Sequence, residues 1–84
     1  MIKLYTGPNC SACTKLKGRL DGLGIPKESY EEANVNDAAH RAAVVALGFR
    51  GIPLLVKYVE GTEELVGTLM GASYGDAEYK EFFA

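Results

Sequence analysis

The amino-acid sequence predicts an α/β domain in which helices cover both faces of a four-stranded mixed sheet. The first half of the chain shows strand, helix, strand and helix patterns in turn, and two parallel strands joined by a helix explain its opening. The second half shows a hairpin and then a helix, which adds antiparallel strands. The 84 residues, 48% hydrophobic and 24% charged, are expected to form one globular domain, residues 1–84.

The first strand and the first helix are the clearest of these patterns. The apolar run Ile2–Tyr5 predicts a strand, and the turn residues 6–9 end it. A helix is predicted to begin at Cys10 and to end at the glycines and the proline of residues 22–26. Its apolar side chains recur at helical spacing and form one stripe: Cys13, Leu16, Leu20 and Leu23.

The middle of the chain predicts a weak strand and a second helix. Residues 27–33 form the strand pattern, although most of them are polar. The helix is expected over Ala38–Leu47, capped by Asn36 or Asp37. The side chains expected to face the sheet are Ala39, Ala43, Ala46 and Leu47.

The last third of the chain predicts a hairpin and a short helix. Residues 54–59 and 64–66 are the two strands, and the turn Glu60-Gly61-Thr62 joins them. Residues 69–75 are expected to form a loop. Asp76 is expected to cap a final helix that ends at Phe83.

Charge and hydrophobicity exclude several functions. A net charge of -2 and a pI near 5.3 give no general attraction to nucleic acid or to an anionic membrane surface. The longest apolar run, residues 42–49, is far shorter than a membrane span, and the first residues do not resemble an export signal. We therefore expect a cytoplasmic monomer with protein partners, in a compartment where structural disulfides are rare.

The only two cysteines, Cys10 and Cys13, are separated by two residues at the predicted helix start. Unpaired N–H groups and the helix dipole favour an anion there, so they favour a thiolate at Cys10. Cys13 shares the apolar stripe and is expected to be shielded. The pattern therefore predicts that Cys10 attacks a disulfide and that Cys13 resolves the product.

Other roles for these residues are open on the sequence alone. As zinc ligands the two cysteines would supply only half of a four-ligand site, and His40 is the one further ligand that the chain offers. They also suit an inert buried pair, because free cysteine is often a small core residue. Lys15 and Arg19 lie one turn apart in the first helix, where a solvated surface is favoured over a docking patch.

The stretch IKLYTGPNCSACTKLK resembles the active-site segment of glutaredoxins and of NrdH-type redoxins, and Ile52-Pro53 in LGFRGIPLLV resembles their second landmark. The resemblance runs along the whole chain and implies the thioredoxin fold, in the order βαβ-α-ββα. It also implies that the Ile52-Pro53 peptide bond is cis, that Pro53 packs beside the disulfide, and that Ile52 offers its backbone to an extended substrate peptide.

The resemblance implies a redox-active Cys10-Cys13 disulfide without a bound cofactor or metal. Implied partners are a protein disulfide such as that of ribonucleotide reductase, and an electron source, either NADPH through a thioredoxin-type reductase or glutathione. The implied substrate-binding residues are Tyr5, Ile52, Pro53, Met70 and Gly71. Phe49, Leu69 and Tyr74 are further candidates for apolar contacts. The residues expected to support the cysteines are Pro8, Asn9, Ser11, Ala12 and Thr14.

Two departures from the glutaredoxin pattern bear on the electron donor. Gly7 stands where glutaredoxins usually carry a basic residue that holds a glutathione carboxylate, and residues 66–76 keep only fragments of the Gly-Gly-acidic segment. These departures favour a redoxin that a thioredoxin-type reductase reduces. A glutathione-dependent glutaredoxin is the alternative. A second alternative is a protein of another functional class: a non-enzymatic thioredoxin-fold module that binds a partner or senses redox state.

Overall fold

The computed structural model describes all residues from Met1 to Ala84. Four strands form one sheet in the order β2-β1-β3-β4: β1 (Ile2–Thr6), β2 (Glu31–Asn34), β3 (Leu54–Tyr58) and β4 (Leu65–Met70). β1 and β2 are parallel, and β3 is antiparallel to β1 and β4. The helices are α1 (Ser11–Gly22), α2 (Ala38–Ala46) and α3 (Asp76–Phe83). The predicted four-stranded mixed sheet is therefore confirmed.

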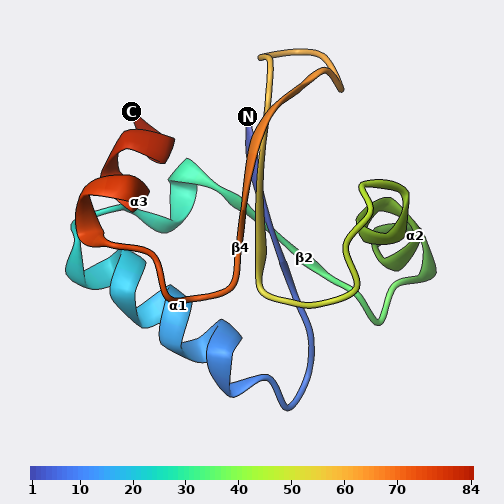
Figure 1. The fold of residues 1–84 in the computed structure, drawn as a ribbon, viewed down its shortest axis with the longest axis horizontal. Coiled ribbons are helices and arrows are strands. Elements are labelled where there is room, and N and C mark those ends of the chain that lie inside the picture. Colours follow the sequence, from blue (N-terminus) through green and yellow to red (C-terminus); the bar gives the residue numbers. More distant parts are fainter.

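The helices lie on opposite sides of the sheet, with α1 and α3 on one face and α2 on the other (Figure 1). Each face has its own hydrophobic core. The core under α1 and α3 contains Ile2, Leu4, Leu16, Leu20, Leu55, Ala72 and Tyr79. The core under α2 contains Tyr5, Ala33, Val44, Leu54 and Val56. None of the helices is long and apolar enough to cross a membrane.

Three loops meet at one edge of the sheet because of the strand register. Leu54, the first residue of β3, pairs with Tyr5 of β1 and with Met70 of β4. The segment after β1, the segment before β3 and the segment after β4 therefore lie along the same edge, the lower one in Figure 1. These are the segments that carry the cysteines, Ile52-Pro53 and Gly71.

Two predicted strands have different limits in the structure. Residues 27–29 form a 3-10 turn, in which the Ser29 N–H bonds to the Pro26 carbonyl, so β2 begins only at Glu31. β4 runs to Met70. Residues 69 and 70, which were expected to begin the loop, therefore belong to the strand, and that part of the prediction is wrong. Pairing with β3 extends β4 through Gly67, which has weak strand propensity by itself.

The helix faces and caps also differ in detail from the predictions. Asp37 caps α2, because its carboxylate accepts the N–H groups of Ala39 and His40. Ala39 and Ala46 are exposed, and Val44 is the residue of α2 that is buried against the sheet. Burial of Val44 removes more apolar surface from water than burial of Ala39 or Ala46 would, which favours this rotation of the face.

The cap of α3 is Gly75 rather than Asp76, which is the first residue of that helix. The Asp76 carboxylate instead accepts a bond from Arg19 at 2.7 Å. The same guanidinium donates to the carbonyls of Ala72 and Tyr74 and lies over the ring of Tyr79. Arg19 therefore connects α1 to the loop after β4, and the prediction that it is a freely solvated surface residue is wrong. Lys15 is exposed, as predicted.

Gly18 lies in the interior of α1, and a Cβ atom built on it meets no other atom within 4 Å. We expect Gly18→Ala to stabilise the protein by about 0.5–1 kcal/mol, because alanine lowers the backbone entropy of the unfolded chain and costs no contact in the folded one. Urea denaturation of wild type and variant measures the difference. Gly24→Ala is the contrasting variant, since Gly24 has φ of 77°, and it is expected to destabilise.

Candidate redox site

The cysteines lie at the start of α1 and form a disulfide. Their Cα atoms are 5.3 Å apart, within the range that a disulfide requires. Cys10 is the N-cap residue, one position before the helix begins, and Cys13 lies in its first turn. The Cys10 side chain is half-buried, whereas only 2% of Cys13 is exposed. Of the two sulfur atoms, the one of Cys10 is therefore the accessible one.

Backbone N–H groups of α1 converge on Cys10. The N–H of Cys13 donates to the Cys10 Sγ at 3.1 Å, so the sulfur takes the place of a capping oxygen. The Cys10 carbonyl accepts bonds from the Thr14 N–H at 3.2 Å and the Thr14 hydroxyl at 3.4 Å. No acidic side chain lies in the first turn of α1. When the disulfide is reduced, this environment stabilises a thiolate at Cys10.

This asymmetry predicts which cysteine reacts first with a thiol reagent. We expect a limiting amount of iodoacetamide, added to the reduced protein near neutral pH, to label Cys10 at least about ten times faster than buried Cys13. Trypsin leaves both cysteines in one peptide, Leu4–Lys15, so fragmentation of that peptide must assign the label. Preferential labelling of Cys13 would reverse the assignment of the two roles.

The residues around the cysteines form an exposed turn and the helix start. Pro8 and Asn9 are exposed, and Asn9 has φ of 54°, a left-handed conformation that asparagine tolerates better than most residues. Ser11 is also exposed. Ala12 is half-buried and packs against the core under α1 and α3. The turn therefore raises Cys10 to the surface while α1 anchors the next residues.

The segment before β3 provides the second side of the site. The Ile52-Pro53 peptide bond is cis, as the resemblance implies, and Pro53 is buried. The Pro53 carbonyl accepts a bond from the Gly71 N–H at 2.9 Å, and Gly71 has φ of 90°. Neither backbone polar group of Ile52 bonds to another group of the protein. Its N–H and carbonyl are thus available to an incoming chain.

Gly7 lies directly beneath the side chain of Ile52. A Cβ atom at Gly7 would stand 2.7 Å from Ile52 Cδ1 and 3.2 Å from Val35 Cγ2, so a larger residue would displace these side chains. Met70 has a similar relation to Gly51, since a Cβ there would stand 2.5 Å from Met70 Cε. The two glycines let the apolar side chains close over the edge of the sheet.

A shallow hollow of about 490 Å³ opens at the disulfide. Its lining includes Gly7, both cysteines and the exposed residues Ser11 and Thr14. Lys17 also lines it, although it was not predicted as a site residue. Lys17 forms an ion pair with Glu32 at 3.2 Å, and the same carboxylate accepts a bond from the Thr6 hydroxyl. Because Lys17 follows Cys13 by four residues, it lies on the same side of α1, and this helical spacing is the signal from which it could have been predicted.

Tyr5 does not take part in this surface. Only 1% of Tyr5 is exposed, and its ring packs in the core under α2, with an edge contact to His40. Burial raises the pKa of the Tyr5 phenol, and the neighbouring Tyr58 raises it further. The substrate-binding role predicted for Tyr5 is therefore wrong, because the register that pairs it with Leu54 points the side chain into the core.

The other apolar candidates differ in position. Met70 and Phe49 are half-buried and pack against the core under α2, while Leu69 and Tyr74 pack against the other core. Met70 and Gly71 flank the end of β4 beside Pro53, so the structure brings Ile52, Pro53, Met70 and Gly71 together at one edge. Leu69 and Tyr74 belong to the opposite face.

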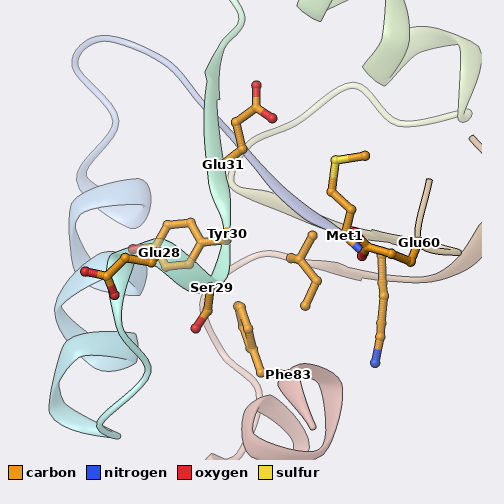
Figure 2. Close-up of a pocket in the computed structure, with 9 residues that line it drawn as sticks. Met1, Glu28, Ser29, Tyr30, Glu31, Glu60 and Phe83 are labelled. Atoms are coloured by element: carbon orange, nitrogen blue, oxygen red, sulfur yellow. The ribbon is translucent and has the colours of Figure 1, made fainter. Parts of the chain in front are cut away.

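Two further features carry no comparable chemistry. No three His, Cys, Asp or Glu side chains gather closely enough to hold a metal ion, and His40 lies on α2, across the sheet from α1. A hollow of about 450 Å³ at the far end of β1 is lined by Met1, Tyr30, Phe83 and three glutamates (Figure 2). Its lining contains neither cysteine nor histidine, so the disulfide hollow is the candidate redox site although it is shallow.

The fold and the Cys10-x-x-Cys13 disulfide at the start of α1 define a thiol redoxin of the thioredoxin superfamily. The family model for glutaredoxin matches residues 2–61, and the chain belongs to the glutaredoxin family. No curated protein sequence matches the chain.

Solved structures support the fold. The chain is similar to the thioredoxin-like protein BC3987, with a TM-score of 0.67 and 23% identity over the full length of both chains. It is also similar to a thioredoxin mutant from Halobacterium salinarum, with a TM-score of 0.67 and 21% identity, over 98% of this chain and 69% of that one. The thioredoxin of Plasmodium falciparum gives a TM-score of 0.61 and 16% identity, over 98% and 80%.

Proposed function

We propose that this protein is a dithiol redoxin of the NrdH type, which reduces disulfides in proteins and receives electrons from NADPH through a thioredoxin-type reductase. The observation that carries the proposal is the asymmetry of the two cysteines. The Cys10 sulfur is accessible and accepts the Cys13 N–H, whereas Cys13 is almost fully buried behind it. One nucleophile and one resolving thiol are what a dithiol exchange requires.

In the proposed reaction the Cys10 thiolate attacks one sulfur of the substrate disulfide. A Cys10-substrate disulfide forms, and the other substrate sulfur leaves as a thiolate that takes up a proton. Cys13, as its thiolate, then attacks the Cys10 sulfur and closes the Cys10-Cys13 bond, which releases the second substrate thiol. Two electrons pass from the protein dithiol to the substrate, and the reductase returns them from NADPH.

A protein substrate fits the surface better than a small buried ligand does. The disulfide lies in an open hollow lined in part by Gly7, and the Ile52 side chain lies against Gly7. The N–H and carbonyl of Ile52 form no bond within the protein. An extended peptide can bond to those two groups as an added strand does. Ribonucleotide reductase as the particular substrate comes from the resemblance to NrdH-type redoxins.

Two observations favour a reductase over glutathione as electron donor. The space above Gly7 is filled by Ile52 and Val35, so the position has neither a cation nor free room for one. The start of α3 carries its own carboxylates, Asp76 and Glu78, and Glu78 Oε1 already accepts the Gly75 N–H at 3.3 Å. Asp76 is likewise paired with Arg19, so these groups are already engaged within the protein and are not free to bind glutathione.

A coupled turnover assay tests the proposal. The protein is mixed with hydroxyethyl disulfide or with insulin, and NADPH oxidation is followed with a thioredoxin-type reductase. Turnover that depends on the protein supports a disulfide oxidoreductase. Its absence with every donor, in a protein whose Cys10-Cys13 bond still opens with dithiothreitol, would favour the non-enzymatic binding module.

A further inference from the structure

An apolar groove adjoins the redox site on its α2 side. The groove has a volume of about 240 Å³, and we call it the α2 groove; its apolar lining includes Val35, Val45, Phe49 and Ile52. Val45 is 63% exposed although it is hydrophobic. Nothing in the exchange between the two cysteines requires this groove or an exposed valine beside it. Exposed apolar surface next to a reactive group is typical of surface that a partner covers.

The α2 groove and the disulfide hollow lie next to each other, on the two sides of Ile52 and Val35. Ile52 lines the groove, and its Cδ1 atom lies directly over Gly7, which lines the hollow around Cys10. Val35 also lies against Gly7 and lines the groove. Since an extended chain advances about 3.3 Å per residue, a peptide that bonds to the Ile52 backbone places its neighbouring side chains over the groove.

Two arginines at the groove lack partners within the protein. Arg41 of α2 and Arg50 before β3 both line the groove and are exposed. Neither guanidinium lies within 4.0 Å of a carboxylate, and neither forms a hydrogen bond. By contrast, Lys17 and Arg19 are both paired. In a chain of net charge -2, two unpaired guanidiniums beside apolar side chains form a local positive surface.

We propose that the α2 groove is a specificity site for the protein substrate. An apolar side chain close to the substrate cysteine enters the groove, and an adjacent Asp or Glu pairs with Arg41 and Arg50. Guanidinium groups bind carboxylates through paired hydrogen bonds, and the apolar lining lowers the local dielectric around them. The partner is therefore an extended acidic and apolar segment; this inference rests on the proposed reduction of protein disulfides.

Synthetic peptides test this specificity without a reductase. Three peptides with the same internal disulfide carry Leu-Glu-Glu, Leu-Lys-Lys or Ser-Glu-Glu beside one cysteine, each made in N-terminal and C-terminal versions. Pre-reduced protein is mixed with each peptide, and acid stops the thiol-disulfide exchange at set times. The second-order rate constant for reduction of the peptide is then obtained from the time course. We expect Leu-Glu-Glu to react about tenfold faster than Leu-Lys-Lys at low salt, with the ratio falling as salt screens the charges.

Charge-reversal variants locate the effect. We expect Arg41→Glu and Arg50→Glu each to lower the ratio of Leu-Glu-Glu to Leu-Lys-Lys rates by about threefold. Lys27→Glu is the matched control: it makes the same charge change at an exposed residue of the 3-10 turn, at the other end of the sheet, and should keep the wild-type ratio. Val45→Ser should reduce the preference for Leu-Glu-Glu over Ser-Glu-Glu.

Equal rates for the three peptides would overturn the proposal while leaving the proposed function intact. So would a preference that Lys27→Glu lowers as much as the arginine variants do. Failure to reduce any peptide would contradict the proposed function itself. Chemical-shift mapping with the Leu-Glu-Glu peptide, its cysteines replaced by serine, needs no variant: shifts at the Val45 and Arg50 amides support the proposal, and shifts confined to residues 71–75 contradict it.

Discussion

We expect Cys10→Ser to reduce disulfide turnover on the order of a thousandfold or more, to the rate of the blank. Serine at the N-cap accepts the Cys13 N–H as sulfur does, so α1 keeps its cap. Serine cannot form a mixed disulfide, and Cys13, 2% exposed, cannot reach a substrate sulfur in its place. The coupled assay measures the rate, and circular dichroism checks the fold of the variant.

Cys13→Ser is the complementary variant, and it should stop the reaction one step later. Cys10 still attacks, but no second thiol releases the substrate, so a covalent complex accumulates. Non-reducing electrophoresis and mass spectrometry detect this complex, and dithiothreitol separates it by reducing the mixed disulfide. A complex formed by Cys10→Ser instead would exchange the two roles. If neither variant formed a covalent complex with the substrate, the two-step exchange would be contradicted.

The elements that the sequence predicted well are those with strong local signals. β1, α1 and β3 carry buried apolar patterns, and the turn before Cys10 stops the first strand sharply. β2 and β4 are the outer strands of the sheet. Because β2 buries only Ala33, and β4 is defined by pairing with β3, their limits depend on tertiary contacts that no local pattern expresses.

The same distinction applies to the site. The roles of Cys10 and Cys13 follow from one turn of helix, where spacing fixes which side chain is buried. Tyr5 and Arg19 were misjudged because their environment comes from distant segments. Register turns Tyr5 toward α2, and Arg19 meets Ala72, Tyr74 and Asp76 from the far end of the chain. Local hydrophobic periodicity does not reveal long-range contacts of this kind.

The second large effect concerns the electron donor, and we expect the reductase to recharge the protein about 100-fold faster than glutathione does. A hydrogen bond to a charged group contributes about 1.5 kcal/mol or more, so loss of the two carboxylate contacts of the glutaredoxin pattern amounts to about a hundredfold in rate. Arg41 and Arg50 lie beyond Ile52 in the α2 groove and do not replace the missing cation at Gly7. Gly7 supplies no cation, and the Gly75 N–H at the start of α3 is already bonded to Glu78. Each donor is tested with its own reductase and NADPH at equal protein concentration.

A pair of variants at Gly7 separates charge from steric effects. Any side chain there pushes on Ile52 Cδ1 and Val35 Cγ2, so Gly7→Lys alone would change both shape and charge. Gly7→Ala adds the Cβ without the cation and is the matched control. Glutathione-dependent turnover that rises in Gly7→Lys but not in Gly7→Ala would identify the missing charge as the limiting feature. Efficient turnover of the wild type with glutathione, or glutathione turnover that survives in Cys13→Ser, would instead place this protein among glutathione-dependent glutaredoxins, because glutathione would then resolve the Cys10 mixed disulfide itself.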